Sequence, residues 1–250
     1  MDHWFLIRGL VREAAHWGAF LPAFSAALPD AEVHCLDIPG NGRHHRRPTP
    51  LTVPGIMEVM RAEARRVTAE PAYLFALSLG GMVALEWAHQ HPGELAGIVL
   101  GNTSFGGFSP FYRRMRPQAW LPVLRSSMAR DPVDKQRAIL SVISSRTEVH
   151  DATANDWAEV DRLRPVAPKN AFRQIVAASR YRPPATAPRV PHLILCGLGD
   201  RLVDPDCSHA IQRGWNGRLE AHPTAGHDLT LDAGPWVIDR IREWRRGLGG

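Results

Sequence analysis

The sequence has few cysteines and no long uninterrupted run of apolar residues. Its three cysteines are too few for a disulfide framework, and a chain of 250 residues can bury a sizeable core without one. No stretch approaches the roughly eighteen apolar residues that a membrane-spanning helix needs. The opening residues MDHWFLIRGL also lack the basic, apolar and small-residue pattern of a secretory leader. These absences predict a cytoplasmic protein with no membrane span.

The positive charge of the chain is concentrated in one region. A formal net charge of +5 raises the question of nucleic-acid binding. Residues 104–185 hold fourteen Lys and Arg against seven Asp and Glu, a balance of +7 that leaves −2 for the rest of the chain. Such a local excess argues against a protein that coats nucleic acid, and no nucleic-acid partner is expected.

Apolar runs typical of strands alternate with helical patterns in the first hundred and last sixty residues. The predicted strands span residues 3–7, 32–37, 72–77, 97–101, 192–196 and 218–222. The predicted helices span residues 14–28, 53–68, 79–91, 205–214 and 234–245. This alternation predicts an α/β fold whose mostly parallel sheet has about six strands and is flanked by helices.

Residues 104–185 interrupt this alternation. They contain helical segments separated by prolines, show no convincing strand, and lead into the proline-rich connector RYRPPATAPRVP. We therefore predict a core made of residues 1–103 and 186–250. Residues 104–185 form a predicted helical cap, or lid, inserted between the fourth and fifth strands.

One serine stands at the boundary between a strand and a helix. In AYLFALSLGGMVALEWAHQHP an apolar strand runs into Ser78, and a helical pattern begins at the next residue. Ala76, Gly80 and Gly81 are small enough to leave room for a sharp turn. Such a turn would present the hydroxyl above the sheet edge, near the positive end of a helix that stabilises a developing anion.

This stretch resembles the nucleophile elbow G-x-S-x-G of the α/β-hydrolase superfamily, with Ala76 in place of the first glycine. Further along the chain, Asp200 follows the strand in LILCGLGDRLVD and His227 follows the strand in EAHPTAGHDLTLD. The order Ser, Asp, His, each after its own strand, is the order of that fold. DIPGNGR at residues 37–43 also resembles a turn of the family. The resemblance implies an α/β-hydrolase fold without the first two of its usual eight strands.

The resemblance implies a catalytic triad of Ser78, His227 and Asp200, with no metal and no other cofactor. Because a serine hydroxyl is a poor nucleophile at neutral pH, His227 would take its proton and later return it to the leaving group. Asp200 would orient the imidazole and stabilise its charged form. Asp204 and Asp228 are alternative carboxylates, but Asp204 precedes a proline like a helix cap and Asp228 adjoins the histidine.

The oxyanion hole implied by the resemblance uses the backbone N–H groups of Leu79, after the nucleophile, and Leu10, after an early strand. Relatives usually carry His-Gly at the end of that strand, whereas IRGL has Arg8 in place of the histidine. A backbone donor survives this replacement. Arg8 has two candidate roles: bracing the loop through carbonyls or a carboxylate, which we favour, or facing the pocket and attracting an anionic substrate.

The predicted lid is rich in aromatic and basic side chains. The candidates for an apolar substrate pocket are Phe105, Phe108, Phe111, Tyr112 and Trp120, although the lid core is favoured for any single one. The basic residues Arg113, Arg114, Arg116, Arg125 and Arg130 are expected to form a solvated face. The alternative hypothesis is that these arginines dock an acidic acyl carrier, as the cap of the similar pimeloyl-carrier methyl ester esterases does. The run RHHRR lacks carboxylate or cysteine partners at ligand spacing and is expected to be an exposed loop.

These residues together predict a serine hydrolase that cleaves a small-molecule carboxylic ester through an acyl-enzyme. A thioesterase, a hydrolase of carrier-linked acyl esters or a carbon–carbon bond hydrolase would use the same nucleophile and oxyanion hole. Ser78 argues against dehalogenases and most epoxide hydrolases of the fold, which use a carboxylate nucleophile. A non-catalytic binding member of the fold is the alternative from another class, and the complete Ser, Asp and His set disfavours it.

Overall fold

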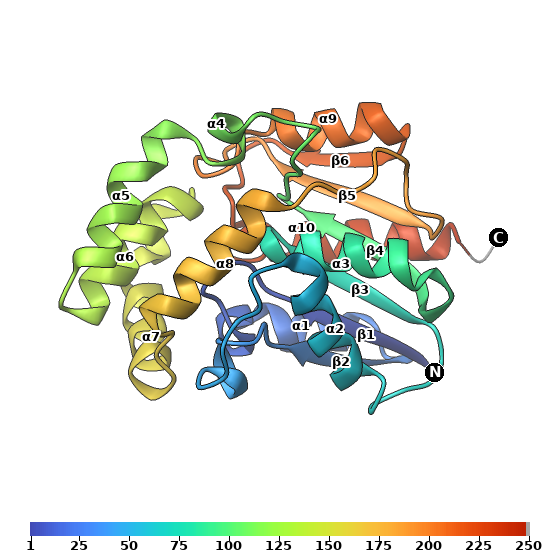
Figure 1. The fold of residues 1–250 in the computed structure, drawn as a ribbon, viewed down its shortest axis with the longest axis horizontal. Helices are drawn as coiled ribbons and strands as arrows, with labels where there is room; N and C mark the ends of the chain where they lie inside the picture. Colours follow the sequence, from blue (N-terminus) through green and yellow to red (C-terminus); the bar gives the residue numbers. More distant parts are fainter. Residues whose placement is uncertain (249–250) are drawn as a thin grey trace.

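A computed structural model describes residues 1–248 and contains one six-stranded sheet (Figure 1). The strands are β1 (Asp2–Ile7), β2 (Ala31–Leu36), β3 (Ala72–Leu77), β4 (Leu95–Gly101), β5 (His192–Gly197) and β6 (Arg218–His222). Their spatial order is β2-β1-β3-β4-β5-β6, and every neighbouring pair is parallel. The predicted α/β fold with six parallel strands is confirmed.

The four inner strands are largely buried on both faces, so their side chains alternate between two apolar clusters. In β1, Phe5 and Ile7 belong to one cluster, and Trp4 and Leu6 belong to the other. The helices of the first face are α2 (Val53–Ala64), α3 (Leu79–Gln90) and α9 (Asp206–Trp215), and those of the second are α1 (Phe20–Ala27) and α10 (Leu229–Arg246). Burial on both faces explains why strands such as AYLFAL are apolar throughout.

The helix predicted over 53–68 ends at Ala64, and two other helices depart further from their predicted course. The helix predicted over 14–28 is divided into the 3₁₀ turn η1 (Ala14–Trp17) and α1, because Gly18 between them adopts a left-handed φ of 49°. The helix predicted from residue 234 begins at Leu229, with a non-helical residue at Ala233. Pro235 has no N–H to continue the hydrogen-bond ladder there. Within residues 1–248, no helix is long and apolar enough to cross a membrane.

Between β4 and β5 the chain forms helices and no strand over residues 104–185, all of which are described. They are α4 (Phe111–Arg114), α5 (Pro117–Met128), α6 (Pro132–Ile143), α7 (His150–Leu163) and α8 (Pro168–Arg180), with the 3₁₀ turn η4 (Thr147–Val149). Three of these helices begin with proline, whose missing N–H costs nothing at the first position. We call residues 104–185 the insertion; Figure 1 shows α5, α6 and α7 to the left of the sheet, with α8 running back toward it.

Candidate active site

Ser78 occupies the sharp turn between β3 and α3. Its backbone has a φ of 54° and a ψ of −117°, a conformation that costs a residue with a side chain about 1–3 kcal/mol. A Cβ on Gly80 would lie 2.6 Å from the Ile7 carbonyl oxygen, and one on Gly81 would lie 2.8 Å from Thr103 Cβ. The glycines are therefore required because the ends of β1 and β4 pass so close to this turn.

Two hydrogen bonds to the end of β4 hold the turn in this conformation. The Ser78 N–H donates to the Gly101 carbonyl at 2.9 Å, and the Thr103 hydroxyl donates to the Ser78 carbonyl at 2.8 Å. Strained backbone persists only where surrounding contacts enforce it. These contacts oppose relaxation of the turn and keep the serine at the end of the sheet.

Asp200 and His227 meet in the loops that follow β5 and β6. The Asp200 Oδ2 and His227 Nδ1 atoms are 2.7 Å apart, and the two residues are 2% and 9% exposed. The other oxygen of Asp200, Oδ1, accepts hydrogen bonds from the backbone N–H groups of Leu202 and Val203 at 2.8 and 2.9 Å. A carboxylate fixed on Nδ1 selects the imidazole tautomer that keeps a lone pair on Nε2.

The two alternative carboxylates have other partners. Asp204 accepts a hydrogen bond from the Asp206 N–H at 3.0 Å, at the start of α9. Asp228 accepts one from the Leu231 N–H at 3.3 Å, in the first turn of α10. Asp228 therefore caps α10, and Asp204 bonds the backbone where α9 begins. Of the three carboxylates considered, only Asp200 is bonded to His227.

Arg8 is buried behind this site and is paired with Asp228. Its Nη1 and Nη2 atoms donate to the two Asp228 oxygens at 3.2 and 2.5 Å, and Nη1 also donates to the Thr230 hydroxyl at 3.2 Å. The guanidinium carbon lies 4.8 Å from the centre of the Trp17 ring, and the residue is only 4% exposed. Burial opposes ionisation of Asp228, but the charge and hydrogen bonds of Arg8 outweigh it and lower the Asp228 pKa. This geometry favours the bracing role over the pocket-facing one.

The loop after β1 passes against the serine. A Cβ on Gly9 would lie 3.0 Å from Ser78 Cβ. Within residues 1–248, neither the Leu10 N–H nor the Leu79 N–H donates to a protein acceptor. Leu79 begins α3, and the first N–H groups of a helix have no partner inside it. Two unpaired donors on segments that adjoin Ser78 have the chemistry that an oxyanion hole needs.

Contacts with the insertion fix the two residues that follow Leu10 in this loop. Val11 has a φ of 57°, unusual for a β-branched residue, and its N–H donates to Gln174 Oε1 of α8 at 2.9 Å. Arg12 donates to Gln136 Oε1 of α6 at 2.9 Å, and its guanidinium carbon lies 4.3 Å from the centre of the Trp157 ring in α7. Three insertion helices thus fix the two residues that follow the candidate oxyanion donor Leu10.

Asn102, directly after β4, belongs to the site although the sequence patterns do not point to it. It is 2% exposed, and its amide nitrogen donates to the carbonyls of Gly226 and His227, both at 2.9 Å. Its amide oxygen accepts from the Gly197 N–H at 2.8 Å. Asn102 therefore ties the end of β5, three residues before Asp200, to the loop that carries His227. Its φ of 44° is one that asparagine tolerates better than most residues.

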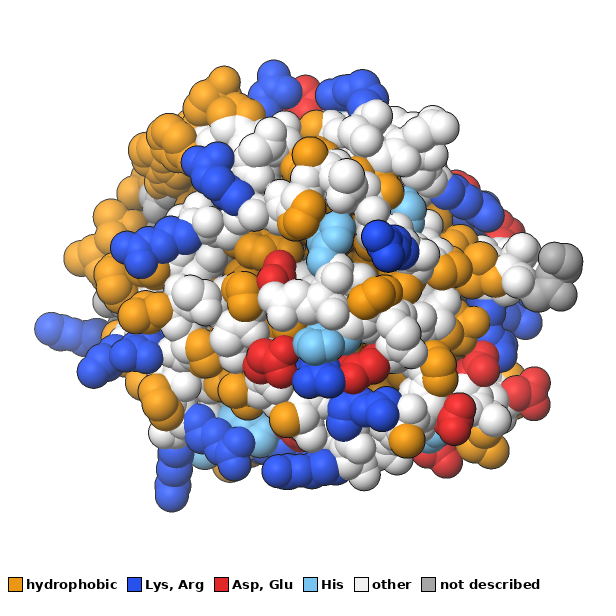
Figure 2. Space-filling view, turned by 45° about the vertical axis from the view of Figure 1, so that its right-hand side comes forward, with side chains coloured by type: hydrophobic (Ala, Val, Ile, Leu, Met, Phe, Trp, Pro, Cys, Tyr) orange, Lys and Arg blue, Asp and Glu red, His pale blue; other side chains and the backbone are white. Residues whose placement is uncertain are grey.

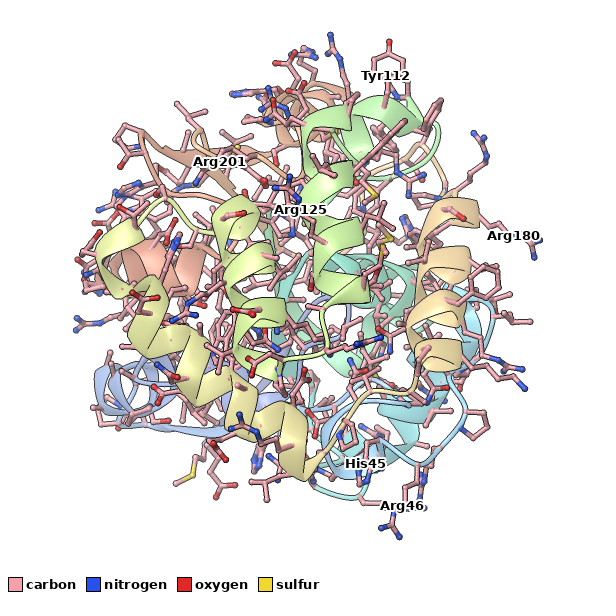
Figure 3. The ribbon with its side chains drawn as sticks, turned by 90° about the vertical axis from the view of Figure 1, so that its left-hand side faces the viewer. His45, Arg46, Tyr112, Arg125, Arg180 and Arg201 are labelled. Atoms are coloured by element: carbon pink, nitrogen blue, oxygen red, sulfur yellow. The ribbon has the colours of Figure 1, made fainter. Side chains whose placement is uncertain are left out.

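The five aromatic residues considered for a substrate pocket lie in different settings. Phe105 is fully buried, stacks on Trp215 of α9 and contacts Phe108 edge-on, so it belongs to the core and has no surface for a substrate. The other three are largely exposed: Phe111 by 70%, Tyr112 by 51% and Trp120 by 49%. Figure 3 shows Tyr112 pointing outward at the top of the view. The structure does not gather the five into one pocket.

The insertion exposes further apolar side chains on two of its helices. On α5, Leu121, Leu124 and Met128 recur at helical spacing and are 54%, 53% and 72% exposed, and on α8, Phe172 is 64% exposed. Figure 2 shows hydrophobic side chains gathered at the upper left, with Lys and Arg side chains beside them. Exposed apolar patches of this kind mark contacts with ligands, proteins or membranes.

The five insertion arginines do not form a uniform solvated face. Three have partners: Arg113 pairs with Asp206 at 2.8 Å, and Arg114 and Arg116 donate to the carbonyls of Ala178 and Asp200 at 2.6 and 2.9 Å. Arg125 and Arg130 are exposed and have no protein partner within residues 1–248. Figure 3 labels Arg125 on α5. Only these last two are available for an external anion.

The fold and the geometry around Ser78 define the class of protein as an α/β hydrolase. The sequence model of the family described as serine aminopeptidase, S33, matches residues 7–234, and the chain belongs to this family. A putative non-heme bromoperoxidase from Mycobacterium tuberculosis H37Rv has a similar fold, with a TM-score of 0.77 and 21% identity over 99% of this chain and 93% of that one. A thermophilic esterase from Thermogutta terrifontis gives 0.70 and 22% over 99% and 90%.

Curated relatives resemble a part of the chain. A pimeloyl-[acyl-carrier protein] methyl ester esterase from Xanthomonas campestris pv. campestris is 35% identical over 91 residues, which are 36% of this chain and 34% of the relative. The enzyme of the same description from Xylella fastidiosa is 32% identical over 87 residues, or 35% and 32% of the two chains. The match thus spans about a third of the length of these relatives. The chain is a hydrolase of this family with esterase homologues.

Proposed function

We propose that the protein is a serine hydrolase that cleaves a carboxylic ester through an acyl-enzyme. The proposal assigns Ser78 as the nucleophile, His227 as the general base and acid, and Asp200 as the residue that orients His227. The observation that carries it is the 2.7 Å contact between Asp200 Oδ2 and His227 Nδ1, in a chain whose serine has the strained backbone of a nucleophile elbow.

Each residue has a defined step in this mechanism. His227 Nε2 takes the hydroxyl proton as Ser78 Oγ attacks the ester carbonyl, and the N–H groups of Leu10 and Leu79 donate to the resulting oxyanion. His227 then gives the proton to the alcohol oxygen, which leaves. A water molecule repeats the sequence on the acyl-enzyme, and the carboxylic acid departs. Asp200 stays ionised throughout and stabilises the imidazolium.

In this proposal the insertion acts as the lid that selects the acyl or alcohol group. The exposed apolar stripe of α5 supports an apolar acyl group as the preferred substrate. A thioester or a carbon–carbon bond next to a carbonyl would be cleaved by the same groups. These alternatives differ in the leaving group and not in the assigned residues.

A second candidate substrate is an acyl ester carried on an acidic carrier protein. Two observations favour it. The exposed, unpaired Arg125 lies on the same helix as the apolar stripe. The curated relatives that match a third of the chain are named as esterases of a carrier-linked methyl ester. A salt series separates the candidates. Carrier docking predicts faster hydrolysis of the carrier-linked ester than of the free ester, falling with ionic strength and in Arg125→Glu. Equal rates that do not depend on salt would rule the carrier out.

The main proposal is tested with p-nitrophenyl esters of increasing acyl length. Ser78→Ala should lower kcat by about 10³- to 10⁶-fold with an unchanged thermal midpoint, because only the nucleophile is removed. Ser127→Ala, an exposed serine of α5, serves as the matched control and should retain full activity. Undiminished hydrolysis by Ser78→Ala would contradict the mechanism. A folded wild-type protein without any hydrolysis would favour the binding-module alternative.

A further inference from the structure

His3, Glu32 and His34 form a cluster at the start of β1 and β2, outside the candidate active site. The two strands pair in parallel, with His3 opposite Glu32 and Phe5 opposite His34. Because residues two apart on a strand share a face, the three side chains project from the same face of the sheet. Their side chains are 16%, 53% and 29% exposed, so an ion in solvent has access to them.

One potential ligand atom from each residue converges on a common point. His3 Nδ1 and His34 Nε2 are 3.4 Å apart, and Glu32 Oε2 lies 3.4 Å from the His34 atom and 3.6 Å from the His3 atom. Ligands placed tetrahedrally around zinc, at its usual bond lengths, lie about 3.3 to 3.6 Å from one another. The three separations therefore match one face of a zinc coordination tetrahedron.

Hydrogen bonding explains these distances less well. Other histidine–carboxylate contacts of the chain are much shorter: 2.7 Å for His227 and Asp200, 2.7 Å for His44 and Glu63, and 2.9 Å for His91 and Glu58. Good hydrogen bonds to nitrogen have lengths of roughly 2.7 to 3.2 Å. The cluster is thus too wide for a tight hydrogen-bonded trio. Among residues 1–248 it is also the only group of three His, Cys, Asp or Glu residues whose ligand atoms converge.

We propose that His3, Glu32 and His34 bind a zinc ion, with water as the fourth ligand. Two imidazoles and one carboxylate are a donor set that suits zinc, whereas Mg²⁺ and Ca²⁺ prefer oxygen ligands alone. The rings of His3 and His34 are stacked with centroids 5.7 Å apart, and the Phe5 ring lies 5.3 Å from that of His34. These contacts restrain both imidazoles in the orientation that makes their nitrogens converge.

The zinc ion would stabilise the edge of the sheet and would take no part in ester cleavage. β2 is the edge strand, and the ion would connect its side chains to β1. The six residue-to-residue steps from His3 to Gly9, which adjoins Ser78, span roughly 20 Å of extended chain. The inference therefore does not depend on the proposed function.

The experiment compares the thermal midpoint and calorimetric stoichiometry of the whole chain with and without zinc. At a zinc concentration of about 100 times Kd, the wild-type midpoint should rise by about 5 to 10 °C, and one ion should bind per chain. His34→Gln should lose both effects. Glu32→Gln, at an exposed position, should lose them as well, and this variant carries the test if His34→Gln fails to fold. Mg²⁺ should leave the midpoint unchanged.

His91→Gln is the matched control, because His91 contacts one carboxylate and no second histidine. This variant should keep the full zinc response, and Ser78→Ala should respond like the wild type. Two results would overturn the proposal. One is the absence of a zinc response in the wild type; the other is an equal response in the wild type, His34→Gln and Glu32→Gln, which would place the ion elsewhere.

Discussion

The sheet and the insertion are held by different kinds of contact. The sheet lies between two large apolar clusters, and strand residues such as Leu74 and Ile98 are fully buried. The insertion has one small apolar cluster of its own and exposes large side chains such as Met128 by 72%. Polar contacts such as that of Arg12 with Gln136 attach it to the loop after β1. Substitutions should therefore affect chemistry and stability at the sheet, and substrate choice at the insertion.

The largest effect is expected at the end of the sheet, on the activity that we propose for Ser78, His227 and Asp200. Asp200→Asn should lower kcat by about 10⁴-fold, because the amide no longer selects the productive tautomer of His227. Asp204→Asn is the matched control, since it removes an alternative carboxylate that is half-buried, bonds the Asp206 N–H and does not contact His227. Steady-state kinetics on a short ester measure both. A greater kcat loss in Asp204→Asn than in Asp200→Asn would overturn the assignment of the carboxylate.

The next effect is on stability, at the buried ion pair behind the site. Arg8→Met should lower the free energy of unfolding by about 3–5 kcal/mol, because it leaves Asp228 buried without its counter-charge. Urea unfolding measures the loss. Since folding lowers the Asp228 pKa, the pair contributes its stability above the unfolded value of about 3.9 and loses it as the pH falls through the folded value. If Arg8→Met unfolded with the same free energy as the wild type, the ion pair would contribute nothing to stability.

Asn102 tests whether the segments that lead to Asp200 and His227 depend on a shared polar contact. Asn102→Ala should lower the free energy of unfolding by about 1–3 kcal/mol, because it leaves buried backbone groups unpaired. It should also lower kcat more than it changes KM, because the His227 loop loses its attachment. Asn155→Ala, at an exposed asparagine of α7, is the control. Urea unfolding and steady-state kinetics measure the two effects. A loss of stability with an unchanged kcat would show that the role of Asn102 is purely structural.

His16, in the 3₁₀ turn η1, makes stability depend on pH. Burial and the charges of Arg12 and Arg8 hold its pKa well below 6.5, so it is neutral in the folded chain. The unfolded chain binds the extra proton below about pH 6.5, and His16 then lowers stability by up to about 1.4 kcal/mol per pH unit. His16→Gln should flatten the pH dependence of urea midpoints between about pH 5 and 6.5. An unchanged slope in this variant would assign the dependence to other groups.

The smallest stability effect is expected on the exposed stripe of α5. Leu121→Ser should change the free energy of unfolding by less than about 0.5 kcal/mol, because the side chain is 54% exposed. It should lower kcat/KM for long-chain esters relative to short ones if this stripe contacts the acyl group. Ser127→Leu is the control for the opposite change, because it adds an apolar side chain to the same helix from which Leu121→Ser removes one. An unaltered chain-length profile would separate the stripe from substrate selection.

Sequence patterns predict the inner strands well because these strands are buried on both faces and leave continuous apolar runs. The strand at residues 72–77 has the predicted bounds. The pattern fails at Gly18, where a left-handed residue divides a predicted helix. The sharp turn at Ser78 is predictable because its constraints are local, namely a strand end followed by small residues.

Contacts between distant segments are the part that sequence patterns miss. The pairing of Arg8 with Asp228 joins residues 220 positions apart, and nothing local in either segment indicates it. Asn102 gains its role from the meeting of two loops, and the His3 cluster arises from strand register. Phe105 and Phe111 look alike in sequence, yet one is fully buried and the other is 70% exposed. Residue type alone does not separate core from surface in an insertion.

The hydrogen bond between Val11 and Gln174 of α8 has a consequence for protein engineering. The left-handed backbone of Val11 is kept by a hydrogen bond to Gln174, which lies 163 positions away in the insertion. An insertion transplanted from another hydrolase would change the exposed surface and would also remove this partner. A graft intended to alter substrate range should therefore carry a glutamine at the position of Gln174, or the recipient should be given a glycine at position 11, where left-handed backbone costs little.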